Sequence, residues 1–288
     1  MARIAIVGVG AIGGALAGLL KAAGDHKITL CTRRPLDVLT VYTPQGEEHV
    51  RGSKVTDPSL AQPVDWVIVA TKTYDAEGAA AWLPALCAKQ APVAIVQNGV
   101  EHRERFAPYM DHEHLLPVVI DCPVERKPDG SVHVRGGTLF KVEDSPLGHE
   151  FASLFSATTA KTELVENFAT AAWWKLSINC VGALNALTLK PARVLREEPM
   201  TELARAMVEE CAAVGRAEGA QLETNIADQV MTLYRAHPPE AVNSLLADRL
   251  AGRRMEIDAR NGVILRRGEK HGIATPLNRM AVTLLKAM

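Results

Sequence analysis

The stretch from Arg3 to Gly14 constrains the fold most, because an apolar run breaks there into a glycine loop that leads into an Ala- and Leu-rich segment. Strand, loop and helix in this order predict a Rossmann-type βαβ unit whose loop holds the pyrophosphate of a dinucleotide. In this interpretation the first glycine turns the chain, the second admits the pyrophosphate and the third lets the helix pack on the strand. The alternative is a purely structural glycine turn. The predicted cofactor-binding loop consists of Gly8, Gly10, Ala11, Ile12 and Gly13.

Length and composition bound the remaining possibilities. With 288 residues, of which 48% are hydrophobic, the chain can bury a sizeable core, and two domains are expected. The net charge of -1 gives no support to nucleic-acid or membrane binding, so a small-molecule partner is favoured. No uncharged stretch reaches the roughly 18 residues of a membrane span, and no signal peptide is visible. We therefore expect a cytoplasmic protein, and a homodimer is the oligomeric state considered.

The cysteines show no pairing pattern. Five are scattered along the chain without a CxxC motif, mostly in apolar surroundings. That distribution favours reduced, buried thiols over disulfides. No metal site is predicted.

The end of the second predicted strand, Lys27 to Thr32, indicates which dinucleotide is bound. Enzymes that prefer NAD usually carry Asp or Glu there to hold the ribose 2′-hydroxyl. This chain instead has Arg33 and Arg34, whose guanidinium groups suit a 2′-phosphate. The predicted cofactor is NADP(H). The alternative is that both arginines are solvated loop charges.

Two further apolar runs predict buried parallel strands. Val64 to Ala70 ends in Thr71-Lys72, and Pro92 to Val96 ends in Gln97-Asn98-Gly99. Residues just beyond the carboxyl ends of such strands face the ligand crevice, which places Lys72 and Asn98 where nicotinamide and substrate meet. An ordinary turn explains Asn98 equally well, because Asn-Gly is a favoured turn dipeptide.

The other segments complete a doubly wound parallel sheet over residues 1–165 and an all-α domain over 166–288. Residues 40–63 predict short edge strands, and Lys127 to Gly130 predicts a hairpin joining Leu116–Ile120 to Ser131–Val134. A strand at 161–165 closes the first domain. Helical patterns then cover residues 76–87 and 151–156 in the first domain and 170–189, 200–218 and 258–270 in the second, with shorter pieces between 226 and 250.

The helix expected over 170–189 carries unusual polar residues. Lys175 and Asn179 are four positions apart and share one face of a helix that is otherwise apolar. A lysine whose stem packs while its ammonium reaches water is the structural alternative. Glu256, near the start of the helix expected over 258–270, could likewise only stabilise a helix N-terminus.

Together these motifs resemble the ketopantoate reductases (2-dehydropantoate 2-reductases), NADPH-dependent enzymes of pantothenate synthesis with a Rossmann domain followed by a helical domain. The resemblance rests on seven segments: Gly8 to Gly14, Thr71-Lys72, Gln97 to Gly99, Lys175 to Asn179, Ser244 to Asp248, Gly252 to Asp258 and His271 to Pro276. It implies that Lys72 and Asn98 contact the cofactor and that Lys175 is catalytic. It also implies that Asn179 and Ser244 bind the substrate, together with Asn98, and that Glu256 is the family's acidic residue.

Such a site would reduce a 2-oxo acid to a 2-hydroxy acid. Hydride delivery leaves negative charge on the ketone oxygen, which needs a cation or acid beside it. Lys175 would polarise the carbonyl and donate the proton, and Glu256 would hold the ammonium in place.

The sequence departs from the family pattern at one position. Many members carry a second asparagine four residues after the first, but this chain has Ala183 there, and the nearest asparagine is Asn185. On a regular helix Asn185 points away from Asn179. Reduction of ketopantoate therefore stands beside two alternatives: a different 2-oxo acid or ketone as substrate, and an NADPH-sensing protein without turnover.

Overall fold

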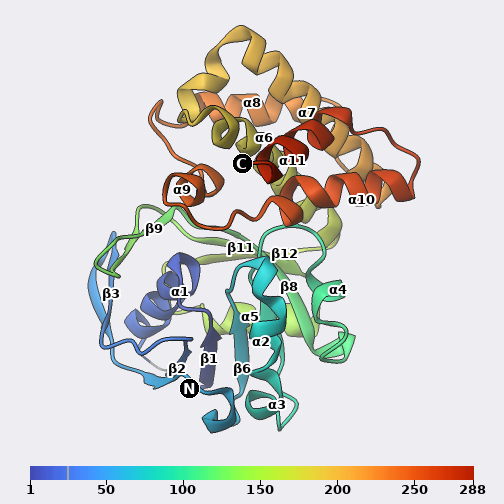
Figure 1. Cartoon of the computed structure of the whole chain (residues 1–288). Helices are drawn as coiled ribbons and strands as arrows, with labels where there is room; N and C mark the ends of the chain where they lie inside the picture. The colour runs from blue at the N-terminus through green and yellow to red at the C-terminus, as the bar shows by residue number, and fades with distance from the viewer. Residues whose placement is uncertain (25) are drawn as a thin grey trace. The chain divides into compact units, whose positions relative to one another are not determined.

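A computed structural model describes residues 1–24 and 26–288 of the chain. By their contacts these residues form two compact units, which we describe separately (Figure 1). The first, the Rossmann unit, comprises Met1–Gln97 and His102–Glu166. The second, the helical unit, comprises Asn98–Glu101 and Asn167–Met288. The sequence predicted domains over residues 1–165 and 166–288, which placed Asn98–Glu101 in the first domain. In the structure this segment belongs to the helical unit.

The Rossmann unit is built on a large sheet, which has eight strands in the described part of the chain. From one edge to the other these are β5 (Ser53–Val55), β2 (Lys27–Cys31), β1 (Arg3–Val7), β6 (Trp66–Val69), β7 (Val93–Ile95), β8 (Leu115–Asp121), β11 (Leu139–Glu143) and β12 (Lys161–Val165). Neighbours from β5 to β8 pair in parallel, whereas β11 runs antiparallel to β8. The order confirms the predicted doubly wound sheet, with an antiparallel addition at one edge.

Helix α1 (Ala11–Ala22) lies between this sheet and a second, smaller one (Figure 1). The second sheet has the order β4 (Gly46–Val50), β3 (Leu39–Thr43), β10 (Val132–Val134) and β9 (Val124–Arg126). A Cβ on Gly14 would come within 2.7 Å of Val132, and one on Gly18 within 2.6 Å of Val41. These glycines therefore let the second sheet pack closely against the helix.

The predicted hairpin around residues 127–130 has a different first strand. The turn is present, with Gly130 at a φ of +87° and Asp129 Oδ1 accepting a hydrogen bond from the Ser131 amide. It joins β9 to β10, whereas β8 pairs with β7 and β11. Residues 115–119 are all buried, which suits the interior of the large sheet. The prediction was thus correct for the turn and wrong for the partner strand.

The helices of the Rossmann unit are short apart from α1. The helix predicted over residues 76–87 is broken into α2 (Ala76–Ala80) and α3 (Leu83–Leu86), because Pro84 lies in the first turn of a new helix. The helix predicted at 151–156 begins earlier, at Pro146, with Ser145 as its N-cap. The remaining helical elements are η1 (Pro58–Leu60), η2 (Thr73–Asp75), α2 (Ala76–Ala80), α3 (Leu83–Leu86), α4 (His102–Phe106), η3 (His112–His114) and α5 (Pro146–Leu154).

The described residues of the helical unit form helices and connecting segments, as expected. Its elements are α6 (Phe168–Thr188), η4 (Ala192–Arg196), α7 (Glu198–Ala217), α8 (Ile226–Ala236), α9 (Ser244–Leu250), a π-helical turn (Asp258–Gly262), α10 (Val263–Lys270) and α11 (Pro276–Lys286). The helix predicted over 258–270 therefore begins with a π-helical turn, and α11 was not predicted. Glu210 on α7 accepts hydrogen bonds from the first amides of α11, those of Leu277 and Asn278.

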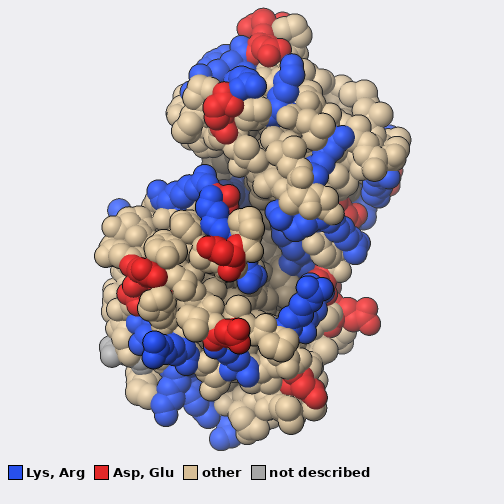
Figure 2. Space-filling view, turned by 60° about the vertical axis from the view of Figure 1, so that its left-hand side comes forward, with Lys and Arg blue, Asp and Glu red and all other residues tan. Residues whose placement is uncertain are grey.

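The thiols and the surface charges agree with what the sequence predicts. All five cysteines are free thiols, and burial raises the pKa of Cys31 to about 12. Figure 2 shows Lys and Arg interspersed with Asp and Glu on the face drawn. Among the helices formed by the described residues, none has the length and apolarity required to cross a membrane.

Candidate functional site

The predicted cofactor residues gather at one edge of the large sheet. Strands β1, β2, β6 and β7 run in parallel, so the segments that follow their carboxyl ends emerge on the same side. These segments contain the glycine loop, Arg33, Lys72 and Gln97. Successive crossovers leave β1 toward β2 and then return to β6 on its other side, and this reversal of strand order is where doubly wound sheets bind ligands.

The glycine loop fits a pyrophosphate. Gly8 has a φ of +92°, and a Cβ on Gly13 would lie 2.0 Å from the Gly8 carbonyl oxygen, so both positions require glycine. A Cβ on Gly10 would meet no atom within 4 Å, so this glycine leaves open space beside the loop. Gly10 also caps α1 without a side-chain hydrogen bond, which leaves the first amides of the helix to an anion.

Arg33 and Arg34 follow β2 and are exposed. The Arg33 side chain is 83% exposed, and its Nη1 lies 3.4 Å from Asp75 Oδ2, a weak ion pair that leaves the guanidinium accessible. The three residues that follow β2, Thr32, Arg33 and Arg34, include no acidic residue. Such a segment fits a ribose 2′-phosphate better than a 2′-hydroxyl. The donor set at this edge therefore fits NADP(H).

Two further contacts organise the same edge. Gln97, two residues after the end of β7, donates from Nε2 to the carbonyl and hydroxyl oxygens of Thr71, both at 3.1 Å, beside Lys72. Arg126 on β9 donates from Nη1 to the Val9 carbonyl oxygen at 2.7 Å, within the glycine loop. Sequence reasoning missed Arg126, because its strand is distant in the sequence and belongs to the second sheet.

A second polar cluster lies in the helical unit. Lys175 and Asn179 occupy one face of α6, and Asn179 Nδ2 donates to Asn98 Oδ1 at 3.3 Å. Asn98 Nδ2 in turn donates to Glu256 Oε2 at 3.0 Å. Glu256 is only 3% exposed, and a buried carboxylate needs such donors. The structure thus brings together Asn98, Asn179 and Glu256, which are far apart in the sequence.

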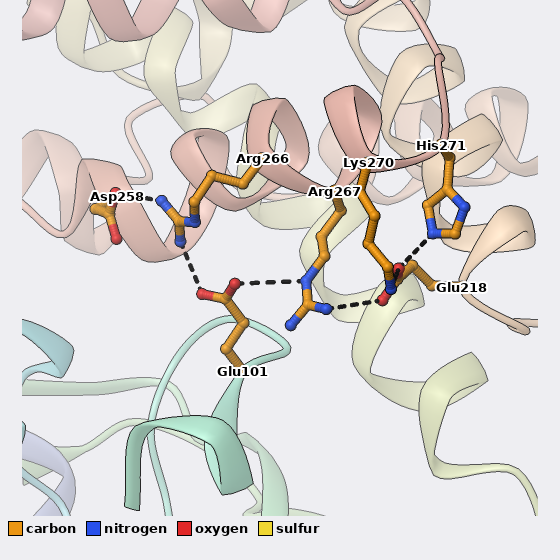
Figure 3. Close-up of polar contacts among 7 residues, drawn as sticks. All are labelled: Glu101, Glu218, Asp258, Arg266, Arg267, Lys270 and His271. Atoms are coloured by element: carbon orange, nitrogen blue, oxygen red, sulfur yellow. Dashed lines mark hydrogen bonds and ion pairs between the residues drawn. The ribbon is translucent and has the colours of Figure 1, made fainter. Parts of the chain in front are cut away.

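An ion-pair network attaches segment Asn98–Glu101 to the helical unit (Figure 3). The Glu101 carboxylate lies 2.7 Å from Arg266 Nη2 and 3.4 Å from Arg267 Nε, both on α10. Arg267 also pairs with Glu218, which binds Lys270 and His271 as well. Ion pairs with Arg266 and Arg267 thus fix Glu101 at one end of segment Asn98–Glu101, and Asn98 lies at its other end.

Ser244, the first residue of α9, lies beside a buried arginine. Its Oγ accepts a hydrogen bond of 2.6 Å from Nη2 of Arg260, a residue of the π-helical turn that is 4% exposed. Sequence reasoning gave Arg260 no role. A signal was available, because an arginine among apolar and small residues at a helix start is unusual.

Asn185 does not replace the missing second asparagine. It is buried, donates to the Lys190 carbonyl oxygen and accepts from Asn243 Nδ2 at 2.9 Å. Asn243 is the N-cap of α9, so Asn185 helps to fix the helix that begins with Ser244. Ala183 is fully buried in the apolar core of the unit.

A phosphate-binding loop on a Rossmann sheet, combined with a lysine, amides and a buried carboxylate in a helical unit, defines a two-domain nicotinamide-dependent oxidoreductase. Comparison with known proteins gives the family. The model "Ketopantoate reductase PanE/ApbA" matches residues 4–146, and its C-terminal counterpart matches residues 167–288. The chain belongs to the ketopantoate reductase family.

Individual relatives agree with this assignment over nearly their whole length. A 2-dehydropantoate 2-reductase of Caulobacter vibrioides is 50% identical over 287 residues, covering 100% of this chain and 99% of the relative. One from Mycobacterium tuberculosis is 37% identical, covering 99% and 97%. The crystal structure of a PanE/ApbA family ketopantoate reductase from Ralstonia eutropha JMP134 superposes with a TM-score of 0.90 at 34% identity, covering 99% and 97%.

Proposed function

We propose that this protein reduces 2-dehydropantoate (ketopantoate) to pantoate with NADPH, a step of pantothenate biosynthesis. The observation that carries the proposal is the chain of hydrogen bonds from Asn179 through Asn98 to the buried Glu256, next to Lys175 on the same face of α6. The full-length relatives of this family carry the name of that activity.

The protein residues supply geometry and charge. When bound, NADPH supplies the hydride. The Lys175 ammonium polarises the ketone and donates a proton to its oxygen, where negative charge develops. Glu256 stabilises the positive charge on that face and fixes the Asn98 amide through the hydrogen bond of 3.0 Å. Asn98, Asn179 and Ser244 orient the carboxylate and hydroxyl groups of the substrate.

A second candidate is a reductase of this family that acts on a different 2-oxo acid. The observation in its favour is Ala183, which offers no hydrogen bond and lies in the apolar core. Asn185 does not compensate, because its amide is bonded to Lys190 and Asn243. A lost hydrogen bond to a substrate hydroxyl costs about 1–3 kcal/mol, enough to change which 2-oxo acid is preferred.

One assay separates these possibilities. NADPH oxidation is followed with ketopantoate and with a panel of 2-oxo acids that have different substituents at the third carbon. The highest kcat/KM for ketopantoate supports the proposal, and a higher value for another acid supports the second candidate. NADPH binding without turnover of any substrate would instead leave the sensing alternative.

A homodimer and a cytoplasmic location, both expected from the sequence, are parts of the same proposal. Light scattering on the purified protein tests the first, for which the expected mass is twice that of one chain. Fractionation of cells that express the protein tests the second.

A further inference from the structure

Arg126 is a cation of the Rossmann unit that the proposed reaction does not use. It is the last residue of β9 and is exposed, so a ligand in solution can reach its guanidinium. Its Nη1 donates to the Val9 carbonyl oxygen at 2.7 Å. A full positive charge therefore lies directly beside the glycine loop.

The register of the second sheet directs the Arg126 side chain toward α1. Arg126 is opposite Val132 in the antiparallel pairing of β9 with β10, and directly opposite side chains lie on the same face of a sheet. Val132 is fully buried, and a Cβ on Gly14, in the first turn of α1, would come within 2.7 Å of it. Arg126 thus leaves the sheet on the face that packs against α1, at the end where this helix begins.

Most of the hydrogen-bonding capacity of Arg126 remains available. Within the described part of the chain, Arg126 makes one hydrogen bond, to Val9, and no ion pair. Arg103 of the same unit shows the contrasting structural case, because it binds both oxygens of the Glu143 carboxylate and the Leu115 carbonyl oxygen. Arg126 is fixed at Nη1, which leaves Nε and Nη2 to donate to an anion.

The acidic residue next to Arg126 in the sequence does not neutralise it. Neighbouring side chains of a strand point to opposite faces, so Glu125 faces away from α1. The Glu125 carboxylate is also paired with other cations, since it lies 3.1 Å from Lys127 Nζ and forms an ion pair with Arg135. The charge of Arg126 thus favours an anion at the glycine loop.

We propose that Arg126 binds the pyrophosphate of NADP(H), together with the first amides of α1. The inference deepens the proposed function, on which it rests, because it takes the glycine loop to hold the dinucleotide. The helix N-terminus supplies only a partial positive charge, whereas Arg126 supplies a full one. Arg33 and Arg34 distinguish NADPH from NADH, while Arg126 binds the group that both contain. The second sheet therefore contributes to cofactor affinity as well as covering α1.

Fluorescence titration with NADPH and NADH tests this assignment without requiring turnover. In Arg126→Met, Kd should rise roughly 10- to 30-fold for both dinucleotides, the range for a lost charge-assisted contact, and by the same factor because both carry the pyrophosphate. Adenosine 2′-monophosphate, which has no pyrophosphate, should bind this variant and the wild type equally well. A loss confined to NADPH, or no loss, would overturn the assignment.

Two further substitutions separate the charge of Arg126 from a purely structural hydrogen bond to the loop. Arg126→Gln keeps an N–H donor for the Val9 carbonyl oxygen but is neutral, whereas Arg126→Lys keeps the charge. The Gln variant should bind both dinucleotides as weakly as the Met variant, and the Lys variant should recover most of the affinity. Wild-type affinity in Arg126→Gln would mean that Arg126 only positions the loop. These two variants decide the matter even if Arg126→Met does not fold.

Arg135→Met is the matched control for a loss of positive charge from the same sheet. Arg135 follows β10 and pairs with Glu125, which remains paired with Lys127 when Arg135 is replaced. The Kd of both dinucleotides should stay within about twofold of the wild type, as expected for an exposed ion pair. A loss equal to that in Arg126→Met would reveal a general effect of surface charge and overturn the specific role of Arg126.

Failure of the proposed function is recognised separately. If the wild-type protein binds NADPH but reduces no 2-oxo acid, the proposed function is wrong, while the titrations still decide the role of Arg126. A folded wild-type protein that binds neither dinucleotide would overturn both.

Discussion

At the scale of single residues, Lys175 gives the sharpest test of the mechanism. Lys175→Met keeps the packed stem and removes the charge, so Tm and NADPH affinity should stay close to those of the wild type. The kcat should fall by roughly 10²–10⁴-fold, the range for removal of a positioned acid or oxyanion donor. Steady-state kinetics and thermal unfolding of the purified variant measure both. A near-normal kcat in the folded variant would refute the role assigned to Lys175.

Cofactor choice is tested at Arg33 and Arg34. Replacing both with Ala should weaken NADPH binding roughly 10- to 100-fold, because the two lost charge-assisted contacts to the 2′-phosphate together cost about 1.4–2.8 kcal/mol at an exposed site. NADH lacks this phosphate, so its affinity should hardly change. Fluorescence titration with both dinucleotides measures the difference. Equal losses for NADPH and NADH would contradict an NADP(H) site.

The glycine loop offers a matched pair of variants. Gly10→Val should fold normally, because a Cβ at Gly10 meets open space, yet it should block both dinucleotides by filling the place of the pyrophosphate. Gly13→Ala should instead lower stability by about 1–3 kcal/mol or more, because its Cβ would overlap the Gly8 carbonyl oxygen. Denaturant unfolding and NADPH titration separate these effects. Unchanged NADPH affinity in folded Gly10→Val would exclude the loop as the pyrophosphate site.

The sequence could predict those residues whose role follows from local pattern. The glycine spacing, the arginines after β2 and the four-residue spacing of Lys175 and Asn179 are all local signals. The partner of Asn98 was not predictable, since Glu256 is 158 positions away and only packing brings the two together. The same holds for Arg260, whose Nη1 lies against Gly182 of a different helix.

At the scale of elements, α10 holds the segment that carries Asn98. Glu101→Gln should weaken the ion pairs with Arg266 and Arg267, loosen segment Asn98–Glu101 and lower kcat/KM roughly tenfold, because a small displacement of a positioning group is costly. NADPH affinity should remain normal. Steady-state kinetics and NADPH titration measure the two effects.

Asp258→Asn is the control for this change. Asp258 pairs with the same Arg266 at 2.6 Å but leaves both contacts of Glu101 in place. Its kcat/KM should stay within about twofold of the wild type, as expected for an exposed ion pair. Equal kinetic effects of the two substitutions would mean that Glu101 has no positioning role.

Elements were predictable where one pattern determined them, as for β1, α1 and α6. The second sheet was not predictable as a unit, because its four strands come from two segments that are separated in the sequence by residues 51–123. Gly14 and Gly18 appeared to be ordinary small helix residues, and their role became visible only with that sheet in place. Helix α11 begins at Pro276, and no helix was predicted there although proline is common in the first turn of a helix.

At the scale of the whole molecule, acid should destabilise the protein partly through Glu218. Burial acts to raise the pKa of this carboxyl, but hydrogen bonds from His271 and Lys270 and the charge of Arg267 outweigh it, so the pKa lies below 4.5. Because the native pKa is depressed, the stabilisation is fully present above pH 4.5 and is lost as pH falls through the native value.

Glu218→Gln measures that contribution. Near neutral pH the variant should be less stable by about 1–2 kcal/mol, and the difference should shrink as the pH drops below 4.5. Denaturant unfolding of both proteins across this pH range provides the measurement. A difference that stays constant in acid would show that the charge of Glu218 is not what stabilises the unit.

The assignment of Asn98–Glu101 to the helical unit means that neither unit is a continuous piece of the gene. Recombination between two relatives at the boundary after Glu166 would exchange residues 167–288 and leave Asn98 behind. The resulting chimera would combine the Asn98 amide of one parent with the Glu256 carboxylate of the other, across the hydrogen bond of 3.0 Å. Exchange of this site between relatives therefore requires two separate insertions, so its two parts are constrained to evolve together.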